Sequence, residues 1–370
     1  MDEERFDAIV VGGGLAGLTA AYTLAQEGLA VILVERSTTC GSKNVTGGKL
    51  CTHSIEKVFP DFINEAPLER HIVKERIYKW ADGQSGCTGM DPSAYNLSVS
   101  PSCTVIRAKL DNWLAERCEE AGVMMIQGIV VNDLLIREGK VCGIVAGDDE
   151  LEANVVILAE GINGLLAQKL GMIGELLPEE TCVGTKEVIE LGEAVINERF
   201  SLEPGKGLEW MFLGDREKGQ YADGFIYTNK DSISVGIEFL ISDIYKTGKS
   251  VPEMLEDFKA LPEVSALIDG GKLIEYSAHL VRKSASEKIG KLYGDGVLLA
   301  GDTAGLVANL GWVVRGMDLA VESGRLAAEA VIRASEKGDF SAEELASYQS
   351  AIEESFIAAD IKACAEYLNR

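Results

Sequence analysis

The sequence predicts an α/β fold that begins with a Rossmann-like dinucleotide-binding unit, carries an inserted antiparallel sheet and ends in helices. The apolar run 6–11 (FDAIVV) precedes a glycine-rich turn, an amphipathic stretch and a second apolar run at 30–34. That order is typical of a right-handed parallel βαβ unit. The alternating, aromatic-rich section 187–238 indicates antiparallel strands. Helical periodicity at 319–337 and 341–367 indicates the terminal helices.

Between these sections, short apolar runs alternate with polar segments. Strands are expected at 123–127, 129–136, 141–146, 155–159 and 296–300. The stretch 110–121 predicts a helix, and Ser250 and Pro252 indicate the start of another at 250–261. The segment 43–49 (KNVTGGK) is glycine-rich and polar, so it predicts a loop.

Composition excludes several function classes. The chain has 370 residues, with 46% hydrophobic and 25% charged residues, which suits a globular protein with a substantial core. Its formal net charge of −24 argues against binding nucleic acid, because a polyanion requires a clustered basic surface. The same charge disfavours docking to an anionic membrane by electrostatics alone.

Cysteine and histidine usage argues against a metal site. Eight cysteines are scattered singly without a CxxC pair, and His53, His71 and His279 are far apart in sequence. We therefore expect neither a zinc ribbon nor a cysteine-ligated iron–sulfur run. The first residues lead directly into a strand, and no apolar stretch is long enough to cross a bilayer as a helix. These features predict a cytoplasmic protein with reduced thiols.

The glycine fingerprint after the first strand is Gly12-x-Gly14-x-x-Gly17, followed by Glu35 at the end of the second strand. Gly12 allows a tight turn, Gly14 the close approach of a pyrophosphate, and Gly17 the packing of helix on strand. Glu35 would accept hydrogen bonds from a ribose. The alternative is a glycine cluster that starts a helix without any ligand. The same nucleotide site is expected to include Leu15, Ala16, Arg36 and Val131.

The fingerprint does not distinguish NAD from FAD, but Gly301-Asp302 does. A strand that ends in Gly-Asp before small residues is found where a carboxylate holds the ribityl chain of FAD, so we predict FAD as the cofactor. Asp302 could instead merely cap a helix. Arg107 stands just before a predicted helix and could reach the phosphates or ribose, although an exposed arginine at an ordinary helix start would look the same.

Several longer strings resemble the FixC and electron-transfer-flavoprotein:quinone oxidoreductase family nearly end to end. They are 41–48 (GSKNVTGG), 250–258 (SVPEMLEDF), 271–279 (GKLIEYSAH), 302–305 (DTAG) and 309–318 (NLGWVVRGMD). The resemblance implies a glutathione-reductase-like FAD-binding domain with a hydroxylase-like substrate lobe. We expect a discontinuous FAD domain at 1–80, 100–170 and 275–337, a lobe at 81–99 and 171–274, and a helical segment at 338–370.

The resemblance also implies which residues surround the flavin ring. One side would be lined by Lys43, Asn44, Val45, Thr46, Gly47 and Gly48. The segment 311–316 would lie on the pyrimidine side, with contacts from Gly311, Trp312 and Val313, where backbone amides stabilise a negatively charged reduced flavin. Thr46 could instead satisfy its own loop backbone. Arg315 and Asp318 are expected to form a structural ion pair on the helix surface.

The sequence departs from the family pattern in two places. Glu160-Gly161 stands where an Asp-Gly pair is common, so the contact of this side chain with the pyrophosphate region or a neighbouring arginine is open. The chain stops at Arg370, whereas family members usually continue, and the quinone oxidoreductases carry a ferredoxin-like iron–sulfur part. We expect either a truncated chain or a cluster supplied by a separate ferredoxin-like subunit.

The function implied is electron relay from an electron-transfer flavoprotein through FAD to a ferredoxin-like subunit or a quinone. No second GxGxxG opens another strand–helix unit, which argues against a dedicated NAD(P)H domain.

One alternative is a reductase or hydroxylase (geranylgeranyl-reductase-like) with a substrate pocket in 185–239. Its one acid–base candidate is His279, for which a structural histidine in the core is the favoured interpretation. Another alternative is a non-catalytic flavin-binding protein. Peripheral association with the inner face of the membrane is open, because in the family it relates to quinone access.

Overall fold

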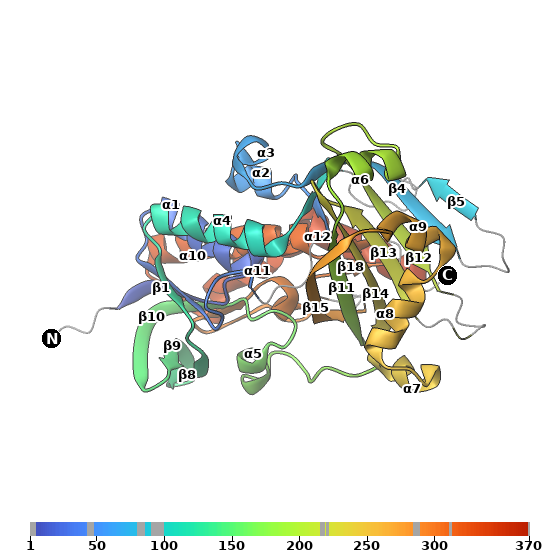
Figure 1. Ribbon diagram of the computed structural model, residues 1–370. Helices are drawn as coiled ribbons and strands as arrows, with labels where there is room; N and C mark the ends of the chain where they lie inside the picture. The colour runs from blue at the N-terminus through green and yellow to red at the C-terminus, as the bar shows by residue number, and fades with distance from the viewer. Residues whose placement is uncertain are drawn as a thin grey trace.

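The computed structural model describes residues 5–42, 48–79, 86–89, 100–214, 219, 222–283, 289–310 and 313–368. Within these ranges the chain forms two large sheets, one in each half of the molecule (Figure 1). The first has the order β16-β17-β10-β1-β2-β7, extended by a β8–β9 hairpin that pairs with β10. Its strands are β1 (Phe6–Val11), β2 (Val31–Glu35), β7 (Met124–Gln127), β8 (Val131–Arg137), β9 (Lys140–Ala146), β10 (Asp149–Leu158), β16 (Tyr293–Gly294) and β17 (Val297–Leu299).

The central strands of this sheet are parallel and buried on both faces. β1 pairs in parallel with β2 and β10, and β10 with β17. Along β1, Ala8 and Val10 face one apolar cluster, while Ile9 and Val11 face another. The continuous apolar run in the sequence therefore reflects burial on both sides, as expected for a parallel sheet under two layers.

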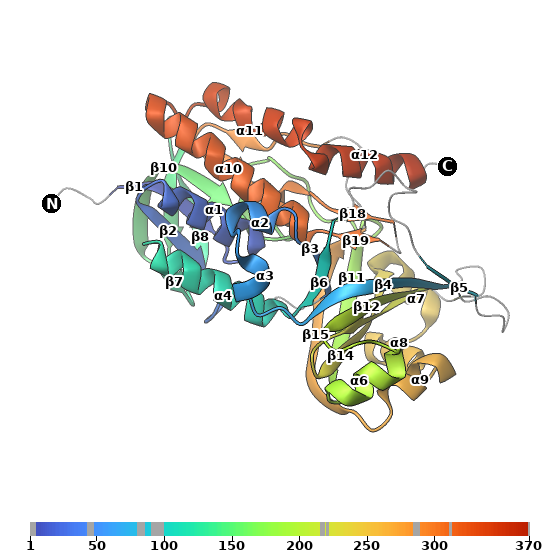
Figure 2. The ribbon, with the colours of Figure 1, turned by 90° about the horizontal axis from the view of Figure 1, so that it is seen from above.

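Helices α1 (Leu15–Gln26), α4 (Arg107–Glu120) and α10 (Met317–Lys337) pack together on one face of this sheet (Figures 1 and 2). Gly324 in α10 permits the closest contact, since a Cβ atom there would lie 2.2 Å from the carbonyl oxygen of Ala16. The remaining helices of this half are α2 (Ile55–Val58), α3 (Phe62–Glu65), α5 (Leu165–Lys169), α11 (Ala342–Glu354) and α12 (Phe356–Leu368).

The second sheet has the order β15-β11-β14-β13-β12-β4-β6-β3, with β5 beside β4. It draws strands from sections that the sequence assigned to both domains. They are β3 (Gly48–Cys51), β4 (Arg70–Lys79), β5 (Gly86–Gly89), β6 (Ser102–Val105), β11 (Thr181–Glu190), β12 (Lys206–Leu213), β13 (Asp223–Thr228), β14 (Ser232–Leu240) and β15 (Lys272–Arg282). A separate short hairpin pairs β18 (Ala308–Asn309) with β19 (Val314–Arg315).

One face of the second sheet carries its own apolar core. Leu208, Phe212 and Ile226 are fully buried there and pack against α6 (Glu193–Phe200), α8 (Val251–Lys259) and α9 (Pro262–Ile268). The short helices η3 (Ile241–Asp243) and α7 (Ile244–Thr247) lead into α8. The opposite face, towards the first sheet, carries polar side chains and helps to form the cavity described below.

The buried guanidinium of Arg70 ties strands of the second sheet to their connecting turns. Its Nε donates to the carbonyl of Asn229, and Nη2 donates to the carbonyl of Lys230 at 2.9 Å. Nη1 donates to the side chain of Asn197 and to the carbonyl of Lys206. The planar guanidinium donates to several fixed acceptors at once, and the single ammonium group of a lysine could not reproduce this geometry.

The C-terminal helices close the first half of the molecule. α11 contacts α10, and α12 extends from there to the β18–β19 hairpin (Figure 2). Arg315 is buried and pairs with Asp318 and with Asp360 of α12. The predicted ion pair is therefore present, but its position on the helix surface was wrong. The second carboxylate comes from a helix far along the chain, which covers the pair.

Several element boundaries differ from the sequence prediction for local reasons. β10 begins at Asp149 rather than 155, because its polar first half pairs with β9 and lacks an apolar run. α4 begins at Arg107 rather than 110, with a polar first turn. Gly48 and Lys49, expected in a loop, start β3. The helix expected at 250–261 is α8, which Ser250 caps, and α9 starts after it at Pro262.

Two further properties follow from the described part of the chain. Seven of its cysteines are free and buried, namely Cys40, Cys51, Cys103, Cys118, Cys142, Cys182 and Cys364. Over the same ranges, no helix combines the length and apolar character needed to cross a membrane.

A pH-dependent contribution to stability is expected from Glu322 of α10. It accepts hydrogen bonds from Lys57 of α2 at 2.8 Å and from Arg325 at 2.9 Å. Burial alone would raise the pKa of Glu322, but these hydrogen bonds outweigh it and lower the pKa. The ionised carboxylate therefore stabilises the fold above the unfolded pKa, and this contribution is lost as pH falls through the folded pKa.

Glu322→Gln should lower the free energy of unfolding by about 2 kcal/mol at neutral pH, measured by urea denaturation. The difference from wild type should shrink below about pH 4. Glu329→Gln is the matched control, since Glu329 pairs with the same arginine but its side chain is 39% exposed, and it should cost less than about 1 kcal/mol. A wild-type–variant difference that does not change on acidification would contradict this assignment.

Candidate functional site: a cavity between the two sheets

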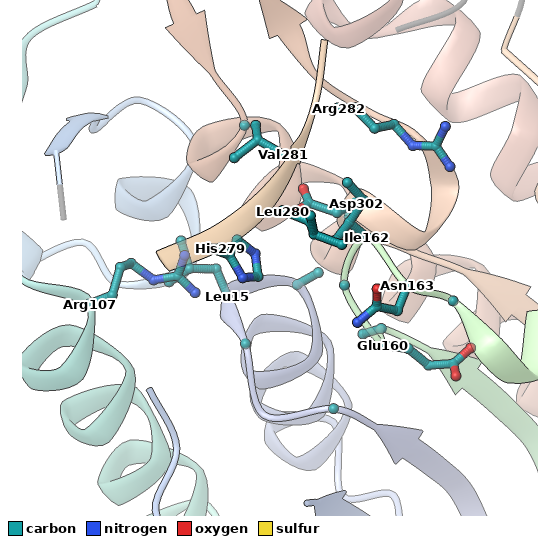
Figure 3. Close-up of a pocket in the computed structure, with 18 of the residues that line it drawn as sticks. Leu15, Arg107, Glu160, Ile162, Asn163, His279, Leu280, Val281, Arg282 and Asp302 are labelled. Atoms are coloured by element: carbon teal, nitrogen blue, oxygen red, sulfur yellow. The ribbon is translucent and has the colours of Figure 1, made fainter. Parts of the chain in front are cut away.

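A cavity of about 580 Å³ lies between the two sheets and extends along the ends of β1, β2 and β10. β1 and β10 are neighbours, and the chain continues from them towards opposite edges of the sheet, through β2 and β7 on one side and β17 on the other. Ligands of open α/β sheets bind at this switch point, outside the carboxyl ends of the strands. Figure 3 shows side chains of β15 in the second sheet, with side chains from α1, from α4, from η4 and from the loop after β10, around the cavity.

The glycine turn brings backbone, rather than side chains, to the cavity wall. Gly12 has φ of 109°, and a Cβ atom there would lie 2.2 Å from the carbonyl oxygen of Ala159. A Cβ at Gly17 would lie 1.9 Å from the oxygen of Gly12, so α1 could not approach β1 with a larger residue. Gly14 is the N-cap of α1 and lines the cavity. The amides at this helix start suit a phosphate.

Glu35 lies at the end of β2 and lines the cavity. Its two carboxylate oxygens accept hydrogen bonds from the amides of Gly13 at 2.7 Å and Ser37 at 2.8 Å. These bonds fix the carboxylate beside the glycine turn, and each oxygen keeps a further lone pair for a ligand hydroxyl.

Asp302 reaches the cavity from the short helix η4 (Gly301–Ala304). The N-cap of η4 is Ala300, and no side chain of the described residues caps it, so the capping alternative for Asp302 is not realised. Burial raises the pKa of Asp302, while His279, Arg107 and Arg282 oppose that rise. The aspartate therefore depends on the cationic groups around the cavity to remain ionised.

Arg107 and His279 approach Asp302 from two different elements (Figure 3). Arg107, the first residue of α4, forms a bidentate pair with Asp111 at 2.7 and 2.8 Å and is mostly buried against the cavity. The exposed-arginine alternative is therefore wrong. His279 lies on β15 and lines the cavity rather than the core; burial lowers its pKa. The Nε of Arg282 is buried without a hydrogen-bond partner among the described residues.

Glu160 lines the cavity, but its carboxylate also serves the protein backbone. It accepts hydrogen bonds from the amides of Leu166 at 2.9 Å and Ala167 at 3.1 Å, at the start of α5. Burial raises the pKa of Glu160. The carboxylate of Glu160 is therefore held by the backbone amides at the start of α5.

The cavity has a half-open end and an enclosed end. Ile129, Val130 and Leu165, all exposed apolar residues, line the open end close to Glu35 and Asn132. A flat apolar ligand group placed there would cover them from water. The enclosed end lies under the second sheet, where the lining includes Lys49, Lys186, Met211, Phe225, Tyr227, Glu238, Val314 and Met317.

The charge balance of the lining differs from that of the whole chain. Among described residues, six lysines and arginines and five aspartates and glutamates line the cavity, whereas the chain contains 35 and 59. The N-terminus of the 21-residue helix α10 also points at it, through Gly316 and Met317. Together with α1, this places two positive helix ends at one cavity, which suits an anionic ligand.

The structure places most of the predicted cofactor residues in this lining. They are Gly12, Gly14, Leu15, Ala16, Glu35, Arg36, Gly48, Arg107, Val131, Glu160, Gly161, Gly301 and Asp302. Gly17 supports the turn from behind, and the side chain of Val313 is in the core while its neighbour Val314 faces the cavity. Lys43, Asn44, Val45, Thr46, Gly47, Gly311 and Trp312 lie outside the described residues.

Sequence reasoning missed the polar residues that the second sheet contributes, chiefly Lys49, Lys186 and Glu238, and Arg282 beside them. Alternation places Lys186 and Glu238 on the polar face of their strands, but no local signal showed that this face meets the nucleotide-binding half. In the described ranges, no group of three or more His, Cys, Asp or Glu is arranged to hold a metal ion.

Comparison with known proteins agrees with this geometry. Residues 7–171 match the family model described as FAD dependent oxidoreductase. The chain is 46% identical over 357 residues to Protein FixC of Escherichia coli, covering 95% of this chain and 82% of that protein. It is also 46% identical over 363 residues to a probable electron transfer flavoprotein-quinone oxidoreductase of Escherichia coli, covering 98% and 84%. The chain belongs to the FixC family of FAD-dependent oxidoreductases.

Membership of the FixC family identifies the cofactor as FAD and the broad activity as electron transfer. The fold is shared with a geranylgeranyl bacteriochlorophyll reductase-like protein from Thermoplasma acidophilum, with a TM-score of 0.80 and 21% identity over 99% of this chain and 88% of that one. The cavity fits FAD on its own evidence, because the glycine turn at the start of α1 suits a diphosphate, and the N-terminus of α10 and the buried, unpartnered Nε of Arg282 suit further negative charge or acceptor atoms of the same cofactor.

Gly14→Val should abolish FAD retention, because a branched side chain at the N-cap of α1 would occupy the space of the phosphate. The readout is the flavin-to-protein absorbance ratio after purification. Gly174→Val is the matched control at an exposed glycine whose Cβ would meet nothing, and it should retain FAD. Stoichiometric FAD in the Gly14 variant would contradict the phosphate assignment.

Asp302→Asn should weaken FAD binding at least about tenfold, because the amide keeps the shape of the side chain but loses a charged acceptor. Titration of the apoprotein with FAD, followed by flavin fluorescence quenching, measures the dissociation constant. An unchanged dissociation constant would mean that Asp302 does not hold the cofactor.

Proposed function

We propose that FAD lies along this cavity with its diphosphate at the start of α1 and its flavin ring under the second sheet. Glu35 and Arg36 would hold the adenosine ribose, with Val131 and Leu165 beside the adenine. Arg107 and Asp302 would hold the central part. The ring would meet Gly48, the preceding residues Lys43, Asn44, Val45, Thr46 and Gly47, and the turn with Gly311, Trp312 and Val313. These assignments rest on the lining of the cavity and on the motif positions.

The same proposal extends to the reaction. The protein would take electrons from an electron-transfer flavoprotein and deliver them to a separate ferredoxin-like subunit or to a quinone. Identity of 46% to both FixC and a probable electron transfer flavoprotein-quinone oxidoreductase is the observation that carries it. The sequence also has no second dinucleotide fingerprint for a nicotinamide donor. With quinone as acceptor, the protein would contact the inner face of the membrane.

Bound FAD supplies reversible two-electron storage, and the residues of the chain set its surroundings. The N-terminus of α10 would stabilise negative charge at the ring end of the cavity. The second sheet excludes water from that end. Asp302, Arg107 and His279 interact electrostatically with one another at the cavity wall.

The second candidate is a reductase or hydroxylase for a small organic molecule. The enclosed end of the cavity favours it, since Met211, Phe225 and Tyr227 offer apolar surface beside the polar groups. His279 would be its nearest acid–base group, from the wall near Asp302.

Anaerobic flavin bleaching with separate donors distinguishes the two candidates. Chemically reduced electron-transfer flavoprotein should bleach the bound FAD rapidly, whereas NADH and NADPH should bleach it slowly. Gly14→Val protein without FAD is the control for absorbance changes of the donor itself. Rapid bleaching by NADH or NADPH would overturn the electron-relay proposal and favour the second candidate. Addition of ferredoxin or a water-soluble quinone to the bleached protein then identifies the acceptor by return of the flavin colour.

A further inference from the structure

A row of three side chains crosses the cavity face of the second sheet. Glu75 of β4 is the register partner of Glu209 of β12, which in turn faces Tyr227 of β13. Residues Leu208, Trp210 and Phe212, which alternate with Glu209, belong to the apolar core on the opposite face. Two carboxylates thus stand side by side on neighbouring strands, an arrangement that repulsion normally disfavours.

Lys49 of β3 compensates for this repulsion. Its Nζ lies 2.5 Å from Glu209 Oε2 and 3.2 Å from Glu75 Oε2. Exposed fractions of the three side chains are 4% for Lys49, 1% for Glu209 and 18% for Glu75. With all three groups ionised, the cluster has one more negative than positive charge in a buried place, so an additional proton would neutralise it.

The electrostatics of the cluster hold Lys49 as an ammonium and favour an additional proton on a carboxylate. Burial raises the pKa of Glu209, and Glu75 adds to the rise while Lys49 opposes it. Burial lowers the pKa of Lys49, but Glu209 and Glu75 outweigh it, so that pKa is raised. Among the described residues, the other titratable groups beside the cluster are Cys51 and Tyr227, and burial raises the pKa of both.

The two ends of the cluster open in different directions. Lys49 and Tyr227 line the enclosed end of the cavity, and the Tyr227 ring lies against Gly48, where a Cβ would be 3.3 Å away. Glu75 does not contribute to the lining and is the partly exposed member. A chain of proton-exchanging groups therefore leads from the cavity to the outer part of the sheet.

A purely structural role would not require this arrangement. Burying ions costs free energy that an apolar cluster of equal volume avoids. The same sheet has a simpler buried pair, Glu187 with Lys259 at 2.8 Å, on the face that carries the apolar core. Lys259 also pairs with Glu256 at 2.7 Å, but Glu256 is exposed, so only one buried carboxylate faces this lysine. Neither Glu187 nor Lys259 lines the cavity.

We propose that Lys49, Glu209 and Glu75 carry protons between the cavity and solvent when bound FAD changes oxidation state. In the outward direction, the Lys49 ammonium gives a proton to the Glu75 carboxylate and at the same time accepts a proton from the cavity. Glu75 then releases its proton to water. Glu209 balances the charge of Lys49 throughout. Reduction runs the same transfers inwards, and the side chains return to their starting states.

Oxidation by ferricyanide tests this proposal without any biological partner. Two ferricyanide ions take two electrons from reduced FAD and no protons, so the flavin protons must leave the protein. The flavin colour and the proton release, recorded with a pH indicator in weak buffer, are followed together in a stopped-flow instrument. In wild type the two signals should coincide. In Glu75→Gln, proton release should lag at least about tenfold behind the colour, with FAD affinity unchanged.

Lys49→Ala should show the same lag, and methylammonium ion should shorten it by occupying the vacated space, whereas Lys49→Met should not respond. Glu187→Gln is the matched control and should behave as wild type. Proton release that keeps pace with the colour in Glu75→Gln would overturn the proposal, even if Lys49→Ala fails to bind FAD. The inference rests on the proposed position of the flavin ring at the enclosed end of the cavity. Because ferricyanide replaces donor and acceptor, a failure of this inference can be told apart from a failure of the electron-transfer flavoprotein to bleach the flavin.

Discussion

The close packing around Ala16 and Gly17 is the constraint on which the rest of the structure depends. Gly17 lets α1 touch the Gly12 carbonyl at the end of β1, and Gly324 lets α10 touch the Ala16 carbonyl from the other side. A Cβ at Gly301 would also lie 2.9 Å from the Cβ of Ala16. Interiors packed this tightly tolerate little added volume. The contact therefore fixes β1, α1, α10 and the Asp302 turn relative to one another.

This packing explains the electrostatics of the cavity. Because α1 and α10 both start beside the same turn, their positive ends face one cavity although Leu15 and Met317 lie 302 positions apart in the chain. Arg107 and Arg282 reach the same place from α4 and β15. A chain with a net charge of −24 thus presents a site whose lining has nearly balanced charge. An anionic dinucleotide in the cavity would interact with the charges of the lining rather than with the average charge of the protein surface.

Buried charged groups join the parts that are distant in sequence. Arg70 holds turns around residues 206 and 230, Arg315 holds α12 through Asp360, and Lys49 joins β3 to β4 and β12. Each cluster satisfies its donors only when its elements are in register, because an unpaired buried charge is costly. The Arg70 and Lys49 clusters therefore specify register within the second sheet and its turns, and the Arg315 cluster specifies how α12 meets the β18–β19 hairpin. In the Lys49 cluster the extra carboxylate also provides exchangeable protons at the cavity wall.

The sequence by itself determined the local units: the βαβ start, the Gly12–Gly17 turn, Glu35 at a strand end, Asp302 after a buried strand, and the capped helix at Ser250. Those signals are local, since a turn or a cap is decided by residues a few positions apart. Only the tertiary structure decided that Arg315 is covered by α12, that the polar half of β10 pairs with β9, and that Lys49 meets two glutamates. Such contacts arise from strand register and helix packing across tens to hundreds of residues. Local pattern determines which face of a strand is polar, but the assembled fold determines what that face meets.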